Sequence, residues 1–122
     1  MSGLCQGVAY AAHVAALSSG GRTIGVLATE MSEPGGTNGD SLFKQVVRDN
    51  LVLSQFTDDT PETEHTRLLR SLTMALLCDG TIVVESGRSG TAVVHARESL
   101  RLGRPTFLLK SAVENTSMVW TK

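Results

Sequence analysis

The sequence is short of the residues on which several classes of protein depend. Its two cysteines, Cys5 and Cys78, are far apart and form no CxxC metal or redox motif. Aromatic residues make up only 4% of the chain, which disfavours an aromatic-rich binding surface. No apolar run approaches the roughly 18 residues of a membrane span, and no basic segment followed by an apolar one marks a secretion signal. We therefore expect a cytoplasmic protein without membrane contact.

Positively and negatively charged residues are also nearly equal in number. Eleven lysines and arginines face twelve aspartates and glutamates, which gives a net charge of −1. Nothing global draws such a chain to nucleic acid or to an acidic membrane, so any anion site must be local. A chain of 122 residues is long enough for one domain with a real core and too short for two.

Helix-like and strand-like segments alternate along the chain. The pattern predicts strands at 22–28, 51–56, 81–86 and 105–109, and helices at 7–18, 41–49, 60–77 and 92–102. Such alternation is typical of an α/β fold, here a Rossmann-like three-layer domain over 1–110 with a mostly parallel sheet of about four strands. Residues 111–122 are expected to form a C-terminal tail. The continuous apolar run at 81–86 predicts a strand buried on both faces.

The first stretch, SGLCQGVAYAAH, runs from a glycine-containing loop into an alanine-rich helix. Loops of this kind present backbone N–H groups to a phosphate, usually from the end of a β-strand. Only Met1 stands ahead of the loop Ser2–Gly7, so no strand is expected to hold it. Ligands of open α/β sheets bind outside the carboxyl ends of the strands. This loop, the loop after the strand at 22–28 and the loop after the strand at 81–86 are predicted to converge there.

A second glycine-containing loop, ESGRSGT, follows the strand at 81–86. Its residues Gly87, Arg88, Ser89, Gly90 and Thr91 combine backbone N–H groups, two hydroxyls and a cation ahead of a helix. This set suits a phosphate. An ordinary tight turn between strand and helix would use the same residue types, and both interpretations stay open.

Two arginines lie three residues apart in the helix predicted at 60–77, for which Thr60 and Pro61 are the start signals. Arginine gives planar, bidentate contact with phosphate, and Arg70 is the candidate for that role. For Arg67 a solvent-exposed position paired with Glu64 is favoured.

The histidines and acidic residues predict no catalytic or metal site. His13, His65 and His95 are scattered without acid–base or ligand spacing, and His13 is expected to be a packed or capping residue. The acidic group comprises Asp58, Asp59, Glu62 and Glu64, which most simply solvate a loop and favour a helix start. No cofactor is expected.

Several stretches resemble, in order, motifs of the DNA-processing protein A (DprA/Smf) family. SGLCQGVAYAAHVAALSSGGRTIGVLAT is similar to the family's SGLA-x-GID-x-x-AH-x-x-AL-x-x-GG-x-TIAVL, and NLVLSQF resembles its GxLLSE strand. RSLTMALLCDGTIVVES resembles RNRIIAGLSDAVVVVEA, and SGTAVVHARESLRLGRPTFLL is similar to the SG…A…GRPVF stretch that follows. The resemblance runs from Ser2 to about Leu109.

The resemblance implies a Rossmann-like domain of the SLOG group, single-stranded DNA as ligand and a RecA-type recombinase as partner. Ser2, Gly3 and Gly7 match the first loop, and Arg70 matches the first arginine of the RNR motif. Ser89 and Gly90 match the later SG loop. Asn38 corresponds to the asparagine after the family's YP turn.

Departures from the family pattern bear on function and assembly. Ala9 stands where the family has the aspartate of GID, and Leu72 replaces the second arginine of RNR. The family's first strand, with its G-S-x-R loop, the strand leading into SGLA and the flanking helical and winged-helix domains have no counterpart here. The strand at 22–28 is therefore expected to lose its usual neighbour, and either to pair with a later strand or to promote a homodimer.

Two other functions stay open beside DNA binding. A small nucleotide-binding sensor would use the same phosphate loops. The phosphoribohydrolases of the SLOG group carry GGxGTxxE, and Gly87, Gly90 and Thr91 fit that pattern. Arg88 replaces its second glycine, and Val94 stands where its glutamate would be, so the sequence offers no catalytic residue.

Overall fold

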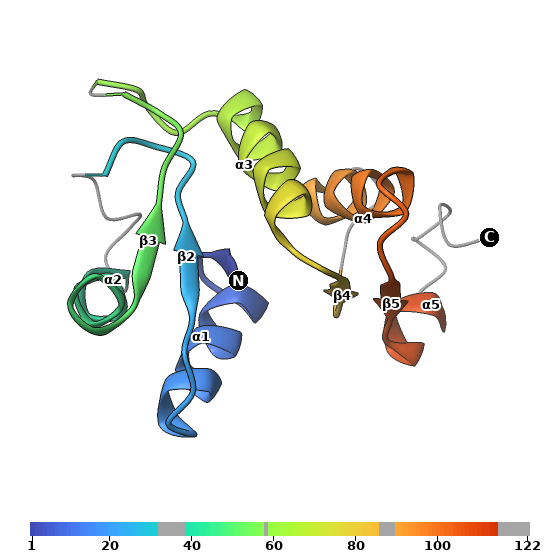
Figure 1. Cartoon of the computed structure of the whole chain (residues 1–122), viewed down its shortest axis with the longest axis horizontal. Helices are drawn as coiled ribbons and strands as arrows, with labels where there is room; N and C mark the ends of the chain where they lie inside the picture. Colours follow the sequence, from blue (N-terminus) through green and yellow to red (C-terminus); the bar gives the residue numbers. More distant parts are fainter. Residues whose placement is uncertain (32–38, 58, 86–89, 115–122) are drawn as a thin grey trace. The chain divides into compact units, whose positions relative to one another are not determined.

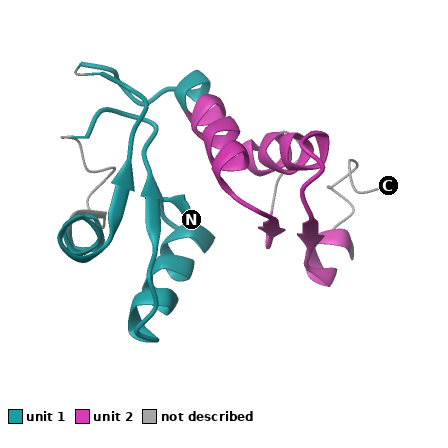
Figure 2. Cartoon of the chain, viewed as in Figure 1, with its two compact units in different colours: residues 1–66 teal, residues 67–122 magenta. Residues whose placement is uncertain are grey.

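Helices and short parallel strands alternate along the chain (Figure 1). The computed structural model describes residues 1–31, 39–57, 59–85 and 90–114. These residues fall into two compact units, residues 1–66 and 67–122 (Figure 2). The alternation and the parallel pairing confirm the α/β fold class.

The first unit is built on a three-stranded parallel sheet in the order β1-β2-β3. Its elements are β1 (Ser2–Gly3), α1 (Val8–Ser18), β2 (Ile24–Val26), α2 (Gly39–Asp49) and β3 (Leu51–Leu53). Ser2 pairs with Gly25, and Ile24 pairs with Leu51. Each strand thus pairs with the next one along the chain, across a helix that makes the crossover parallel strands require.

Four buried side chains, Leu4, Leu27, Leu42 and Val46, form the core of this unit. They lie after β1, after β2 and on one face of α2, where Leu42 and Val46 are one helical turn apart. Tyr10, Leu17, Phe43 and Val52 pack around them. The core is tight beside β2, because a Cβ atom on Gly25 would lie 2.5 Å from Cδ1 of Leu4.

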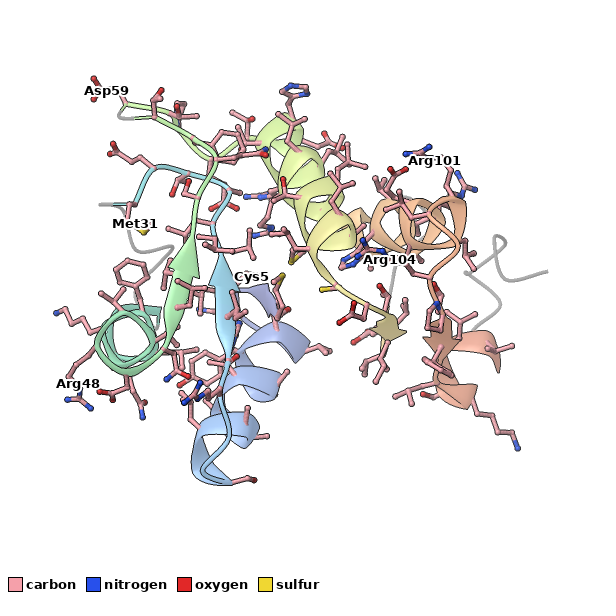
Figure 3. All side chains as sticks on the ribbon, viewed as in Figure 1. Cys5, Met31, Arg48, Asp59, Arg101 and Arg104 are labelled. Carbon is pink, nitrogen blue, oxygen red and sulfur yellow. The ribbon has the colours of Figure 1, made fainter. Side chains whose placement is uncertain are left out.

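The second unit carries a two-stranded parallel sheet covered by a helix. Its elements after α3 (Glu64–Leu77) are β4 (Thr81–Val83), α4 (Thr91–Arg101), β5 (Thr106–Leu108) and α5 (Lys110–Glu114). Thr81 and Val83 are buried at 8% and 4% exposure, as are Val93 and Ala96 of α4, which packs on both strands. Nη1 of Arg104 donates to the carbonyl oxygen of Ala75 at 2.9 Å and satisfies one of the last carbonyls of α3 (Figure 3).

Two expectations about strands are wrong. Ser2 and Gly3 form β1 and do not belong to the loop ahead of α1, so the loop does follow a strand. The β4 strand is not buried on both faces, because Ile82 is 68% exposed while Val83 is 4% exposed. The β2 strand pairs with the later strand β3, which was one of the two expected outcomes, and it also pairs with β1.

The α3 helix starts at Glu64, later than the Thr60–Pro61 signal predicts. Thr63 and Thr66 form a reciprocal cap that fixes this start. The amide of Thr66 donates to Oγ1 of Thr63 at 3.1 Å, and the amide of Thr63 donates to Oγ1 of Thr66 at 2.9 Å. Two amides at the helix start are satisfied in this way, which is the physical advantage of a capping box.

Candidate functional site

The segment between β1 and α1 exposes backbone donors. Gly7 precedes α1 with φ 89° and ψ −138°, a conformation that residues with a side chain rarely adopt. Cys5, at the start of the segment, is an exposed free thiol (Figure 3). In the described part of the chain no side chain caps α1, and its first turn carries no acidic residue. The amide of Tyr10 donates to the carbonyl oxygen of Cys5 at 3.1 Å, and the N–H groups ahead of it at the start of α1 can receive an anion.

His13 ties this segment to the sheet. Its ring is 1% exposed, with Nε2 3.2 Å from the carbonyl oxygen of Gly3 and Nδ1 2.6 Å from Oγ1 of Thr23. A carbonyl oxygen only accepts, so Nε2 carries the proton and the neutral ring accepts the Thr23 hydroxyl at Nδ1. Burial lowers the pKa of His13 below its usual 6.5, which favours this neutral form. His13 is therefore a packed structural residue, as its place in an alanine-rich helix predicts.

Polar groups gather where β2 and β3 end. The loop after the strand at 22–28 was expected at this edge, whereas Ser54 was not singled out from the sequence. The hydroxyl of Ser54 bonds to the carbonyl oxygen of Thr29 at 2.5 Å and accepts the amide of Phe56 at 3.1 Å. A carboxylate oxygen of Glu30 accepts the amide of Asp59 at 3.0 Å. The available signal was position, because Ser54 follows β3 directly and Thr29 follows the apolar residues that end the strand predicted at 22–28. These bonds hold together the edge of the sheet at which α/β folds bind ligands.

The second glycine loop is described only at its end. Gly90 is the N-cap of α4 with extended backbone angles, and its carbonyl oxygen accepts the amide of Val93 at 2.9 Å. Thr91 is half-buried in the first turn, and no side chain of the described residues caps the helix. The start of α4 therefore resembles that of α1, with backbone donors and no cap.

Arg70 is the one predicted site residue whose side chain is both charged and enclosed in the described structure. It is 8% exposed, and its Nε is a buried atom without a hydrogen-bond partner among the described residues. Arg67, three residues earlier, is exposed, as expected for a solvent-facing position.

Two other arginines differ from Arg70 because neighbouring carboxylates neutralise them. Arg48 bonds Asp49 with Nη2 at 2.7 Å, and Arg101 bonds Glu98 with Nη2 at 2.6 Å. These arginines hold the pKa values of the Asp49 and Glu98 carboxyls below their usual range. Both pairs lie at the surface, where such bonds add little stability.

The side chains of Thr81 on β4 and of His95 and Ser99 on α4 are joined by hydrogen bonds. Oγ1 of Thr81 is 3.1 Å from Nε2 of His95 and 2.7 Å from Oγ of Ser99, which is fully buried. Burial lowers the pKa of His95. The sequence signal was the spacing of His95 and Ser99, four residues apart on one helix face. These hydrogen bonds satisfy polar groups that are buried between α4 and the sheet. Ser99 is not accessible to solvent.

The predicted site residues fall on both units. Ser2, Gly3 and Gly7 belong to the first unit, with Gly3 buried and Gly7 exposed. Arg70, Gly90 and Thr91 belong to the second unit, on two different helices. Asn38, Gly87, Arg88 and Ser89 lie outside the described residues. Among the described residues no three His, Cys, Asp or Glu side chains form a metal site, and no helix is long and apolar enough to cross a membrane.

The fold defines the chain as a Rossmann-like α/β protein, and comparison with known proteins supplies the family. The sequence model described as DNA recombination-mediator protein A matches residues 1–119. The chain belongs to this DNA-processing protein A family, as the ordered motifs indicate.

Individual relatives agree with this assignment. The chain is 29% identical over 113 residues to DNA processing protein DprA of Streptococcus pneumoniae, covering 93% of this chain and 40% of that protein. It is 25% identical over 113 residues to DprA of Bacillus subtilis, covering 93% of this chain and 38% of that protein.

The X-ray structure of DprA from Streptococcus pneumoniae is similar to this chain with a TM-score of 0.82 and 28% identity. The similarity covers 93% of this chain and 42% of that chain. The chain thus spans about two fifths of the length of these relatives.

Proposed function

We propose that this chain is a DNA-processing module that binds single-stranded DNA through its backbone phosphates and serves recombination or natural transformation. Membership of the DNA-processing family supports the nucleic-acid ligand. The observation that carries the proposal is the state of Arg70, a buried guanidinium whose Nε has no partner among the described residues.

A buried cation without a counter-charge is costly, and an anion would offset that cost. Phosphate suits a guanidinium because its oxygens accept charge-assisted hydrogen bonds from a planar donor group. Nε itself is enclosed, so a phosphate oxygen would reach it only after the side chain shifts. Binding should therefore be accompanied by a movement of Arg70.

The uncapped starts of α1 and α4 supply further donors for phosphate. Gly7 and Gly90 precede these helices without a side-chain cap in the described structure. We assign Ser2, Gly3, Gly7, Gly90 and Thr91 to this contact, together with the four predicted residues outside the described part, Asn38, Gly87, Arg88 and Ser89. Because aromatic residues are scarce, base stacking contributes little and phosphate contacts dominate.

A titration with a single-stranded oligonucleotide at two salt concentrations tests the proposal. Affinity should fall steeply with salt, because binding releases counterions from the phosphates. Arg70→Ala should weaken binding by about 1–3 kcal/mol, the range for a hydrogen bond to a charged group. Arg48→Ala is the matched control, since it removes the same charge from an exposed pair with Asp49. Equal losses in both variants, or no binding by folded protein at low salt, would reject the proposal.

A small-nucleotide sensor is the second candidate, because the same helix starts and Arg70 fit a mononucleotide. A thermal-shift series with mononucleotides and dinucleotides separates the two functions. Stabilisation that a mononucleotide alone produces would favour the sensor. The phosphoribohydrolase alternative lacks its carboxylate, since Val94 is half-buried on α4 where the glutamate would stand.

We also propose a RecA-type recombinase and a second copy of the chain as partners, in the cytoplasm. The β1 strand pairs with β2 alone among the described strands, and an unpaired strand edge is a template for pairing with another chain. Light scattering at micromolar concentration tests the homodimer, and a clean monomer would exclude it.

A further inference from the structure

The two strands of the second unit have one face covered and one face exposed. Successive side chains of a strand point to opposite faces. Thr81 and Val83 are buried on the side that α4 covers (Figure 1). Ile82, which lies between them in sequence, is 68% exposed, and its register partner Phe107 is 61% exposed. Parallel sheets normally have both faces covered, so this exposed face calls for a partner.

The exposed face continues beyond the ends of the strands. Val84 and Leu109 follow Ile82 and Phe107 by two residues each and are 37% and 43% exposed. The amide of Leu109 donates to the carbonyl oxygen of Val83 at 3.1 Å, so the strand pairing extends to this point. We call the four exposed side chains, Ile82, Val84, Phe107 and Leu109, the β4–β5 face.

The β4–β5 face has the chemistry of a surface that can meet itself. Its four side chains are aliphatic or aromatic and carry no charge and no hydrogen-bonding group. Two copies of one chain that associate about a two-fold axis bring the same surface together, so like charges on that surface would repel. The β4–β5 face has no charge to oppose such a contact, and covering it would leave no polar side chain of the face unpaired.

We propose that the β4–β5 face is the surface through which two copies of this chain associate. The inference rests on the proposed homodimer and specifies its interface. Sheets pack face to face about 10 Å apart, with the side chains of the two faces interdigitating. Two β4–β5 faces packed in this way form one shared apolar layer, with α4 of each copy on the outer side.

The edge of β1 offers a second copy much less than this face. The β1 strand consists of Ser2 and Gly3 alone, and Gly3 has no side chain to bury. A strand added there would gain few hydrogen bonds and little apolar contact. The β4–β5 face contributes Phe107, and aromatic side chains are enriched at protein interfaces because each buries a large apolar area.

The size of the β4–β5 face sets the strength of the association. Four side chains are few beside the roughly 20–30 residues that each partner contributes to a standard protein interface. Interfaces at the low end of the size range belong to weak, transient complexes. We therefore expect a reversible equilibrium between monomer and dimer that shifts with protein concentration.

Sedimentation equilibrium of the full chain over a range of concentrations tests the interface. The average mass should rise toward that of the dimer and stop there, because a two-fold interface closes. Phe107→Ser should weaken dimerisation about tenfold or more, as expected for the central side chain of an interface. Ile82→Lys brings two like charges into the same interface and should abolish the dimer at low salt.

Val47→Ser is the matched control, because Val47 is 51% exposed on α2 and lies outside the face. Ile82 and Phe107 are exposed in the single chain, so the monomer should tolerate their replacement, and far-UV circular dichroism checks this. A dimer that persists unchanged in both face variants, or an equal loss in Val47→Ser, would overturn this interface and leave the homodimer standing. A wild type that stays monomeric at every concentration would overturn both. Growth beyond the dimer would overturn the two-fold contact.

Discussion

The imidazole of His13 lies between the carbonyl oxygen of Gly3 and the hydroxyl of Thr23 and bonds to both. One side chain of α1 thus connects β1 with the residue just ahead of β2. Burial lowers the pKa of His13 and favours the neutral ring, which donates from Nε2 and accepts the Thr23 hydroxyl at Nδ1. This arrangement makes the first unit sensitive to pH and to the identity of residue 23.

Stability should fall as the pH drops below about 6.5. The pKa of His13 is lowered in the folded chain, so the unfolded chain takes up the proton first and unfolding is favoured. Urea unfolding at pH 7.5, 6.5 and 5.5 measures this, in a range above the titration of the carboxyl groups. His13→Gln should flatten the dependence, and the remainder is expected from His95, whose pKa is also lowered. An unchanged slope in His13→Gln would contradict this.

Thr23→Val should destabilise the protein by about 1–3 kcal/mol, because Nδ1 of His13 is left buried without a donor. Valine keeps the size and branching of threonine, so packing changes little. Thr57→Val is the control at an exposed position. Chemical unfolding at pH 7.5 gives the comparison, and equal stability of the two variants would show that the bond adds nothing.

Gly25→Ala should cost about 1–3 kcal/mol through overpacking, since the new Cβ meets Cδ1 of the buried Leu4 at 2.5 Å. A change of Leu4, the residue that the new methyl group would meet, supplies the control. In the background Leu4→Ala, which removes the clashing atoms, the added methyl should cost much less. A double-mutant cycle on unfolding free energies measures this coupling, and additive effects would exclude a clash.

Thr63→Ala should cost about 1 kcal/mol, the usual value of a helix N-cap. Thr60→Ala is the informative control, because Thr60 has the sequence features of a cap while α3 starts at Glu64. Thermal unfolding of both variants decides which threonine caps the helix. A larger effect at Thr60 would contradict the Thr63–Thr66 pair.

Periodicity and composition predicted α1 to α4, their order and the parallel class, because amphipathic helices and short apolar strands leave strong local patterns. They did not predict the short α5 helix. The β1 strand was missed since two residues, one of them glycine, carry no periodic signal. The start of α3 was misplaced because Thr60 and Thr63 look alike until the partner Thr66 is seen.

Burial was harder to predict than secondary structure. The strand predicted at 81–86 has consecutive apolar residues at 82–84, and this pattern cannot reveal that Thr81 and Val83 are covered while Ile82 is not. Arg70 was expected to meet a ligand, and its enclosure follows from packing that no local pattern encodes. Sites assembled from Thr29 and Ser54, or from Thr81 and Ser99, require knowledge of which strands and helices are neighbours.

Every pairing between the described strands joins two strands that follow each other along the chain. Every pairing therefore closes over a single helix, which keeps the entropy of loop closure small. During synthesis, all pairings of the first sheet involve residues up to Leu53. The described pairings of the first unit can thus form before β4 has been made, and this part of the chain can fold in the direction in which it is translated.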